Sequence, residues 1–268
     1  VSRVSPRRAI RANLSRLLHV ERFARFVFLE CGALQIHAAL AQRYPKAECH
    51  ILHPSPAQTR AAQSHMALPW WKGLLRPKQH FAELDAPISP TDMLWANMVL
   101  HGESDPQALI GKWLQRLRPD GFLMFSGLGP NTLLSLRKIY QGLGWPSPTQ
   151  SFIDMHDWGD MLVQGGFSDP VMDMERITLT FQTPERLLIE LRELGRNLYP
   201  QRFAGLRGRG WHRDLLAALH QTKNADGVFT LNFEIIYGHA VRGVQRMKVS
   251  DESRISLDDM RAALQRNR

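Results

Sequence analysis

The chain has 268 residues, of which 44% are hydrophobic and 22% charged, and 34 Lys and Arg against 25 Asp and Glu give it a formal charge of +9. Its 19 Gly and 16 Pro are too few for a collagen-like chain, and its apolar content is too high for a disordered one. No apolar stretch approaches the roughly 18 residues that cross a bilayer, so we expect no membrane-spanning helix. Two cysteines, Cys31 and Cys49, are too few for a disulfide framework, and the expected compartment is therefore the cytoplasm.

The positive charge is concentrated in residues 1–25, which hold seven Arg and a single acid, Glu21. Four apolar residues recur there at helical spacing: Ile10, Leu14, Leu17 and Leu18. This pattern predicts an amphipathic helix. An Arg-rich arm of this kind fits a transit peptide, a nucleic-acid-binding arm or a helix that docks on an acidic protein. A solvated helix without a partner fits it as well.

From residue 26 to residue 126, short apolar stretches alternate with helical ones. Strands are expected at 26–30, 49–52, 79–84, 93–100 and 122–126, and helices at 35–44, 57–66 and 105–117. Asp105 and Pro106 mark the start of the last helix, because Asp is a favoured N-cap and Pro a favoured first-turn residue. The alternation predicts an α/β fold with a right-handed parallel sheet and helices on both faces.

Ligands of such sheets bind at the carboxyl ends of the strands. Four polar residues are expected near these ends: Glu30, His53, Asp85 and Asn97. They are the first candidates for a binding site.

The pattern changes after residue 126. Helices are expected at 131–140, 154–165 and 184–194, strands at 171–181 and 228–237, and an Arg- and Gly-rich loop at 195–212. We therefore expect one domain over 26–248, with a small helical insertion at about 127–168 and a loop-rich stretch at 195–227. A polar tail follows at 249–268.

Two stretches resemble the class I methyltransferases, which use S-adenosylmethionine. They are LECGAL at 29–34, in the place of the family's acidic, Gly-rich first loop, and RPDGFLMFS at 118–126, similar to the turn before its fifth strand. Four C-terminal stretches narrow the resemblance: SGLGPNTL at 126–133, FIDMHDWGD at 152–160, GFSDPVMDME at 166–175 and FEIIYGHA at 233–240. Over about residues 26–245 the chain resembles the malonyl-acyl carrier protein O-methyltransferases of biotin synthesis.

The resemblance implies a Rossmann-like class I methyltransferase sheet with S-adenosylmethionine as cofactor. Aligned with the family pattern, the cofactor-binding residues are Glu30, Gly32, His53, Asp85 and Asn97. Leu34 and Ile36 replace two family glycines, and His53 replaces the acid that binds the ribose, so a one-acceptor imidazole stands where a carboxylate is usual. The alternative hypothesis is a methyltransferase-like protein that has lost S-adenosylmethionine and acts by binding a carrier or another acidic partner.

The implied reaction is methylation of the free carboxylate of malonyl-acyl carrier protein. Because a carboxylate is ionised at pH 7, alignment and desolvation would accelerate this reaction more than proton transfer. The catalytic candidates are Asn97, His156, Tyr237 and His239, and the substrate-binding candidates are Arg137, Arg202, Arg207 and Arg209.

The implied partner is an acyl carrier protein, which is acidic. The basic arm at 1–25 is then better explained as a docking helix than as a nucleic-acid arm, and the C-terminal motifs argue against a nucleic-acid partner. Asp154, Asp157 and Asp160 lie at an expected helix start, where capping accounts for them, so we expect no metal site.

Overall fold

The computed structural model describes residues 25–30, 44, 46–53, 56–57, 59–60, 63, 79–83, 86–194, 199, 201–203 and 205–243. Nearly all of the expected arm at 1–25 and most of the helices expected at 35–44 and 57–66 lie outside these residues. Gly32, Asp85 and the tail at 249–268 lie outside them too.

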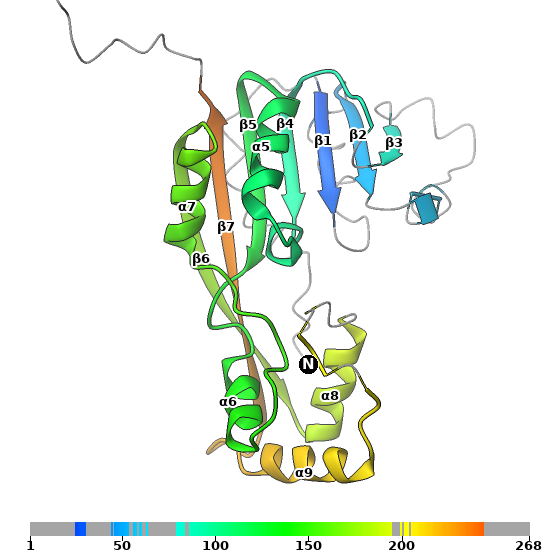
Figure 1. Ribbon diagram of the computed structural model, residues 1–268, viewed down its shortest axis with the longest axis vertical. Helices are drawn as coiled ribbons and strands as arrows, with labels where there is room; N and C mark the ends of the chain where they lie inside the picture. Colours follow the sequence, from blue (N-terminus) through cyan, green and yellow to red (C-terminus); the bar gives the residue numbers. More distant parts are fainter. Residues whose placement is uncertain are drawn as a thin grey trace, which may run out of the picture.

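One sheet of seven strands, in the order β3-β2-β1-β4-β5-β7-β6, organises the described chain (Figure 1). The strands are β1 Arg25–Glu30, β2 Glu48–His53, β3 Gln79–Glu83, β4 Thr91–Asn97, β5 Leu117–Leu128, β6 Phe167–Phe181 and β7 Phe229–Arg242. The first five are parallel to one another, and β7 is antiparallel to both β5 and β6. The α/β fold class and the seven strand positions expected from the sequence are confirmed.

Strand β4 ends three residues earlier than its apolar pattern predicts. Met98 adopts a positive φ of 54°, which turns the chain out of the sheet, and a short 3₁₀ helix, η2, follows at Leu100–Gly102. The strand therefore delivers Asn97, its last residue, to the carboxyl edge of the sheet.

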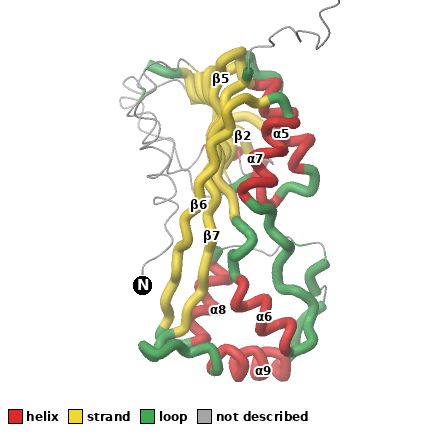
Figure 2. Tube along the Cα trace, turned by 90° about the vertical axis from the view of Figure 1, so that its left-hand side faces the viewer, coloured by secondary structure: helices red, strands yellow, loops and turns green. Residues whose placement is uncertain are grey.

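The described helices are α5 Pro106–Arg116, α6 Leu134–Gly142, α7 Met155–Gln164, α8 Pro184–Glu193 and α9 Arg209–His220. Their starts follow local chemistry: the side chain of Asp105 accepts a hydrogen bond from the Ala108 amide at 2.9 Å, and Thr183 caps α8 in the same way. Helices α5 and α7 lie on the same side of the sheet at one end of the molecule, whereas α6, α8 and α9 gather at the other end (Figures 1 and 2).

The antiparallel pair of strands β6 and β7 extends well beyond the rest of the sheet (Figure 2). We call this pair the hairpin, although α8 and α9 lie between its two strands in the sequence. Strand β7 pairs with β5 only over residues 235–241, while its pairing with β6 continues to Phe229. An isolated two-stranded hairpin is only marginally stable in water. The free part of the hairpin is stabilised here because the three helices α6, α8 and α9 pack against it.

Two hydrophobic cores result from this arrangement. The first lies under α5 and α7 and includes Trp113, Phe125 and Trp158, with the Phe125 ring centroid 6.4 Å from Trp113 and 6.5 Å from Trp158. The second lies between the extended hairpin and the other three helices, and it includes Leu187 and Leu215. The helical layer is thus a second packed unit built on the same two strands.

The structure differs here from the expected domain organisation. The insertion expected at about 127–168 contains α7, but α7 packs on the main sheet through Trp158 and Leu162. The stretch expected to be loop-rich at 195–227 contains helix α9, which buries Leu215 and Leu219 in the second core. The helical layer is therefore assembled from three separate segments of the chain.

We predict that Gly238→Ala destabilises the fold by about 1–3 kcal/mol, as overpacking of a core usually does. Gly238 pairs with Phe125, and a Cβ atom there would overlap the Phe125 ring and lie 2.9 Å from the sulfur of Met172. Urea denaturation measures the change. As a control, Gly111→Ala in α5 meets no atom within 4 Å and should stabilise by about 0.5–1 kcal/mol. Equal stability of the Gly238→Ala protein and the wild type would contradict the packing described.

Candidate functional site

A row of polar residues crosses the carboxyl edge of the sheet in register. Glu30 is paired with Asn97, Asn97 with Ser126, and Ser126 with Tyr237. Directly paired residues of neighbouring strands project from the same face of a sheet. Asn97, Ser126 and Tyr237 therefore lie side by side on one face, although up to 140 residues separate them in the sequence.

The centre of this row is buried and internally hydrogen-bonded. Asn97 is 3% exposed and Ser126 fully buried, and the Ser126 hydroxyl donates to Asn97 Oδ1 over 2.7 Å. The Met98 amide donates in turn to Ser126 Oγ over 3.2 Å. These bonds fix the Asn97 side chain, so its amide nitrogen points away from Ser126.

Tyr237 of β7 is the last residue of the row, on the side of the sheet where β6 and β7 lie. Its side chain is 2% exposed, and its hydroxyl donates to Glu175 Oε2 of β6 over 3.2 Å. Tyr237 also belongs to the second core, so the ring lies where the main sheet meets the helical layer. The phenol is thereby a rigid donor at the boundary between the two packed units.

His53 is the last residue of β2, at the end of the row away from Tyr237. It is also buried, at 5% exposure. Burial lowers the pKa of its imidazole, which favours the neutral form. Its Nε2 atom has no hydrogen-bond partner among the residues that the structure describes, and an unsatisfied buried nitrogen of this kind is uncommon in a folded protein. His53 therefore offers one unused hydrogen-bonding position to a ligand at this edge.

Two of the other catalytic candidates lie away from the row. His239 is two residues further along β7, opposite Met124, and its ring is stacked at a tilt on Phe122 with centroids 5.3 Å apart. The side chain of His156 is 79% exposed at the start of α7, where its Nδ1 lies 2.6 Å from Asp154 Oδ1. The pKa of Asp154 is lowered chiefly by the hydrogen bond from the His156 amide, as expected of a helix cap. The structure thus brings Asn97 and Tyr237 together and leaves His156 outside.

The four candidate arginines lie in two places. The guanidinium of Arg137 donates to the carbonyls of Pro130 and Thr132, the latter over 3.2 Å, and so binds the loop that follows β5. Arg202, Arg207 and Arg209 belong to the segment that leads into α9, at the far end of the hairpin. They contact the helical layer and not the row at the sheet edge.

One buried residue that the sequence analysis did not single out holds the loop that follows β5. Glu234 of β7 is 3% exposed and accepts hydrogen bonds from Asn131, one from Nδ2 over 2.7 Å and one from the backbone amide over 3.3 Å. A Cβ atom at Gly129 would overlap its carboxylate. The loop at 129–132 is therefore held against β7 by Glu234 on one side and by Arg137 on the other. The sequence feature that could have indicated Glu234 is its position as the single acid in the apolar stretch FEII at 233–236.

His101 is a buried histidine at the same end of the sheet. It lies in η2 beside Gly127 at the end of β5, with its ring 6.1 Å from Phe152, and its Nδ1 atom has no hydrogen-bond partner among the described residues. Burial lowers the pKa of His101 to about 4, so the imidazole is neutral at pH 7.

Among the described residues, no three His, Cys, Asp or Glu side chains gather closely enough to hold a metal ion. In the same part of the chain, no helix is long and apolar enough to span a bilayer.

No protein-family model matches the chain. Solved structures nevertheless share its fold. A proposed methyltransferase of Bacillus halodurans superposes with a TM-score of 0.59 at 12% identity, covering 88% of this chain and 99% of that one. Phosphoethanolamine N-methyltransferase 2 of Haemonchus contortus, solved with S-adenosyl-L-methionine, gives 0.52 at 14% identity, covering 88% and 53% of the two chains. The fold is that of the class I methyltransferases.

Curated relatives give the family. The malonyl-[acyl-carrier protein] O-methyltransferase of Laribacter hongkongensis is 37% identical over 218 residues, which are 77% of this chain and 72% of that protein. The enzyme of the same name from Gallionella capsiferriformans is 35% identical over 216 residues, or 78% and 73% of the two chains. The chain belongs to the malonyl-[acyl-carrier protein] O-methyltransferase family, which confirms the resemblance found in its motifs.

We predict that His101 makes the fold sensitive to acid. The unfolded chain protonates this histidine near pH 6.5, whereas the folded chain resists protonation until about pH 4, so stability is lost as the pH falls through that window. Between pH 7.5 and pH 4.5 the wild type should lose about 2 kcal/mol more stability than His101→Gln. Urea denaturation at the two pH values measures this. Parallel losses in the two proteins would show that the imidazole is not buried as described.

Proposed function

We propose that the protein transfers a methyl group from S-adenosylmethionine to the free carboxylate of malonyl-acyl carrier protein. The observation that carries this proposal is the row formed by Glu30, Asn97, Ser126 and Tyr237 at the carboxyl edge of a class I methyltransferase sheet. The names of the relatives supply the substrate. The resemblance stated above adds a place in biotin synthesis, and the cytoplasm is the compartment we infer for the reaction.

The residues at the sheet edge are compatible with the cofactor. The Nε2 atom of His53 has no partner in the described part of the chain and can make one hydrogen bond to a ribose hydroxyl. We assign the Asn97 amide, which Ser126 fixes, to contact with the donor, and Glu30 ends the strand that lies between those of His53 and Asn97. Gly32 and Asp85 complete the proposed cofactor set. When bound, S-adenosylmethionine supplies an electrophilic methyl group.

The protein's contribution is to orient and desolvate the substrate carboxylate. That group is ionised at neutral pH and needs no general base, so the rate depends on its position and on the exclusion of water. Tyr237 can donate one hydrogen bond, and in the described structure Glu175 accepts it. We infer that the substrate carboxylate replaces Glu175 as the acceptor, which orients one of its oxygens toward the methyl donor.

The remaining candidates keep different roles in this proposal. His239 lies too far along β7 to share a ligand with Asn97 directly, and we assign it to the wall behind Tyr237. His156 caps α7, and Arg137 supports the loop at 129–132. Arg202, Arg207 and Arg209 remain candidates for contact with the acidic carrier, as does the arm at 1–25.

The proposal is tested by incubating the protein with malonyl-acyl carrier protein and S-adenosylmethionine labelled in its methyl group. We expect the carrier to gain the mass of one methyl group in a base-labile ester. A carrier without its malonyl group is the control and should gain nothing. If no transfer occurs and titration calorimetry detects no binding of S-adenosylmethionine at millimolar concentration, the enzymatic proposal is wrong.

We predict that Tyr237→Phe lowers kcat/KM for malonyl-acyl carrier protein about 10- to 100-fold, because a hydrogen bond to a charged group is lost. Steady-state kinetics measure this loss. Thr178→Val removes a different hydrogen bond of the same hairpin, the exposed one from Thr178 Oγ1 to Asn232 Oδ1 over 2.8 Å. It should leave the kinetics within twofold of the wild type. Equal activity of both variants would exclude Tyr237 from the site.

We predict that His53→Asp tightens the binding of S-adenosylmethionine about tenfold. A carboxylate can accept hydrogen bonds from both ribose hydroxyls, and charged acceptors bind more strongly than neutral ones. Titration calorimetry gives the dissociation constant. His53→Asn is the neutral control and should stay within twofold of the wild type. Weaker binding by His53→Asp would mean that residue 53 does not face the ribose.

A further inference from the structure

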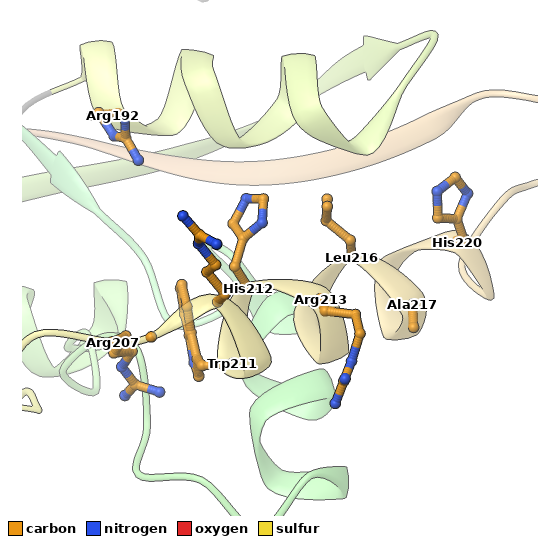
Figure 3. Close-up of a pocket in the computed structure, with 10 residues that line it drawn as sticks. Arg192, Arg207, Trp211, His212, Arg213, Leu216, Ala217 and His220 are labelled. Carbon is orange, nitrogen blue, oxygen red and sulfur yellow. The ribbon is translucent and has the colours of Figure 1, made fainter.

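A basic groove lies between helices α8 and α9, at the end of the molecule away from the sheet edge. It has a volume of about 660 Å³ and is lined by Arg192 of α8 and by Arg209, His212, Arg213 and His220 of α9, among others. In Figure 3, Arg192 hangs from α8 into the space above α9, and His212, Leu216 and His220 rise from α9 toward α8. Side chains of both helices thus form the two walls of one concave surface.

The positive charge of this groove is only partly neutralised within the described chain. Residues 195–213 hold five Arg and no Asp or Glu. Arg213 is paired with Asp214 over 2.9 Å, but no described carboxylate pairs with Arg192 or Arg209, and both of these side chains are exposed. Exposed charges of one sign around a concave surface attract a partner of the opposite sign.

Arg207 lines the groove and is held in a fixed position by aromatic side chains. Its guanidinium lies over the rings of Phe203 at 4.5 Å, Trp211 at 4.8 Å, and Tyr140 and Trp145 at 5.5 Å each. Stacking on several aromatic rings holds the cation in place without neutralising it with a carboxylate. The loop that carries Arg207 is thereby fixed to α6 and α9.

Exposed apolar side chains lie in the same part of the chain as the residues that line the groove. Four of the large hydrophobic residues most exposed in the described chain fall within α8 or between α8 and α9: Ile189, Leu194, Phe203 and Leu206. Leu206 is completely exposed, at 102%. Aliphatic groups among cations suit a folded protein with acidic and apolar patches better than a nucleic acid, whose phosphates they cannot bind.

We propose that the groove between α8 and α9 is the docking surface for the acidic acyl carrier protein, an inference that rests on the function proposed above. The groove and the candidate site share the hairpin. His220 packs its ring against Phe229 at 5.8 Å, and Phe229 and Tyr237 are eight residues apart on β7, or about 26 Å at the usual rise of a strand. A carrier seated there would lie against the same two strands as Tyr237, with its prosthetic arm directed along β7 toward the site.

The test is fluorescence anisotropy with a labelled acyl carrier protein in its apo form, which measures docking without the malonyl group. We expect the double variant Arg192→Glu, Arg209→Glu to bind at least tenfold more weakly than the wild type at low salt. The double variant Arg192→Lys, Arg209→Lys should bind within about threefold of it. Thermal denaturation checks that both variants are folded.

Lys112→Glu is the control for position, because it reverses one positive charge, half the change made by the double Glu variant, on the exposed surface of α5, next to the other core. It should bind like the wild type. If the Lys112 and the double Glu variants lose affinity equally, or if neither does, the groove is not the docking surface. Displacement of the labelled carrier by tRNA at lower concentration than by unlabelled carrier would overturn the proposal in favour of nucleic acid.

The binding test of the docking surface and the methylation assay of the proposed function can fail independently of each other. Failure of the wild type to bind the apo carrier, together with methylation of malonyl-acyl carrier protein, would contradict the docking surface alone. Failure in both assays would contradict both proposals.

Discussion

Strand β7 pairs with β5 over residues 235–241 and with β6 over its whole length, and the candidate site depends on this double pairing. The pairing with β5 places Tyr237 next to Ser126, and Ser126 is next to Asn97 in the same register. A shift of one residue would move Tyr237 to the opposite face of the sheet, because side chains alternate along a strand. Gly238 allows the pairing, since no larger residue fits against Phe125 there.

The same strand joins two packed units that would otherwise be independent. Its second half adds an antiparallel strand to the edge of the parallel sheet, and its first half supports the helices α6, α8 and α9. Glu234 lies at the change from one environment to the other, and its carboxylate holds the loop at 129–132 through Asn131. The proposed chemistry at Tyr237 and the proposed carrier surface on α9 are therefore connected through a single rigid element.

Much of the fold could be predicted from local features of the sequence. The strands of the sheet are short apolar stretches, and Asp105, Asp154 and Thr183 begin their helices as caps. Helix α9 was missed because Gly208 and Gly210 and the surrounding arginines are typical of a loop. Its apolar positions Leu215 and Leu219 are buried only because the hairpin provides a surface to cover them.

The site was harder to predict because its geometry is not local. The register that joins Asn97, Ser126 and Tyr237 depends on pairing between strands far apart in the sequence. The family motifs gave Tyr237 and His156 as catalytic candidates alike, but the strand register places Tyr237 beside Ser126, whereas His156 lies exposed on α7. The role of Glu234 depends on the three-dimensional approach of Gly129 and Asn131, which no spacing along the chain reveals.

The central claim is that the cofactor and the substrate meet at the row of residues from Glu30 to Tyr237, at the carboxyl edge of the sheet. A crystal structure of the protein with S-adenosylhomocysteine, the product of methyl transfer, tests it most directly. We expect the ribose to contact His53 and the sulfur to lie beside Asn97, on the side that faces Tyr237. Density for the ligand at another place on the protein, with the row from Glu30 to Tyr237 left free, would contradict the account.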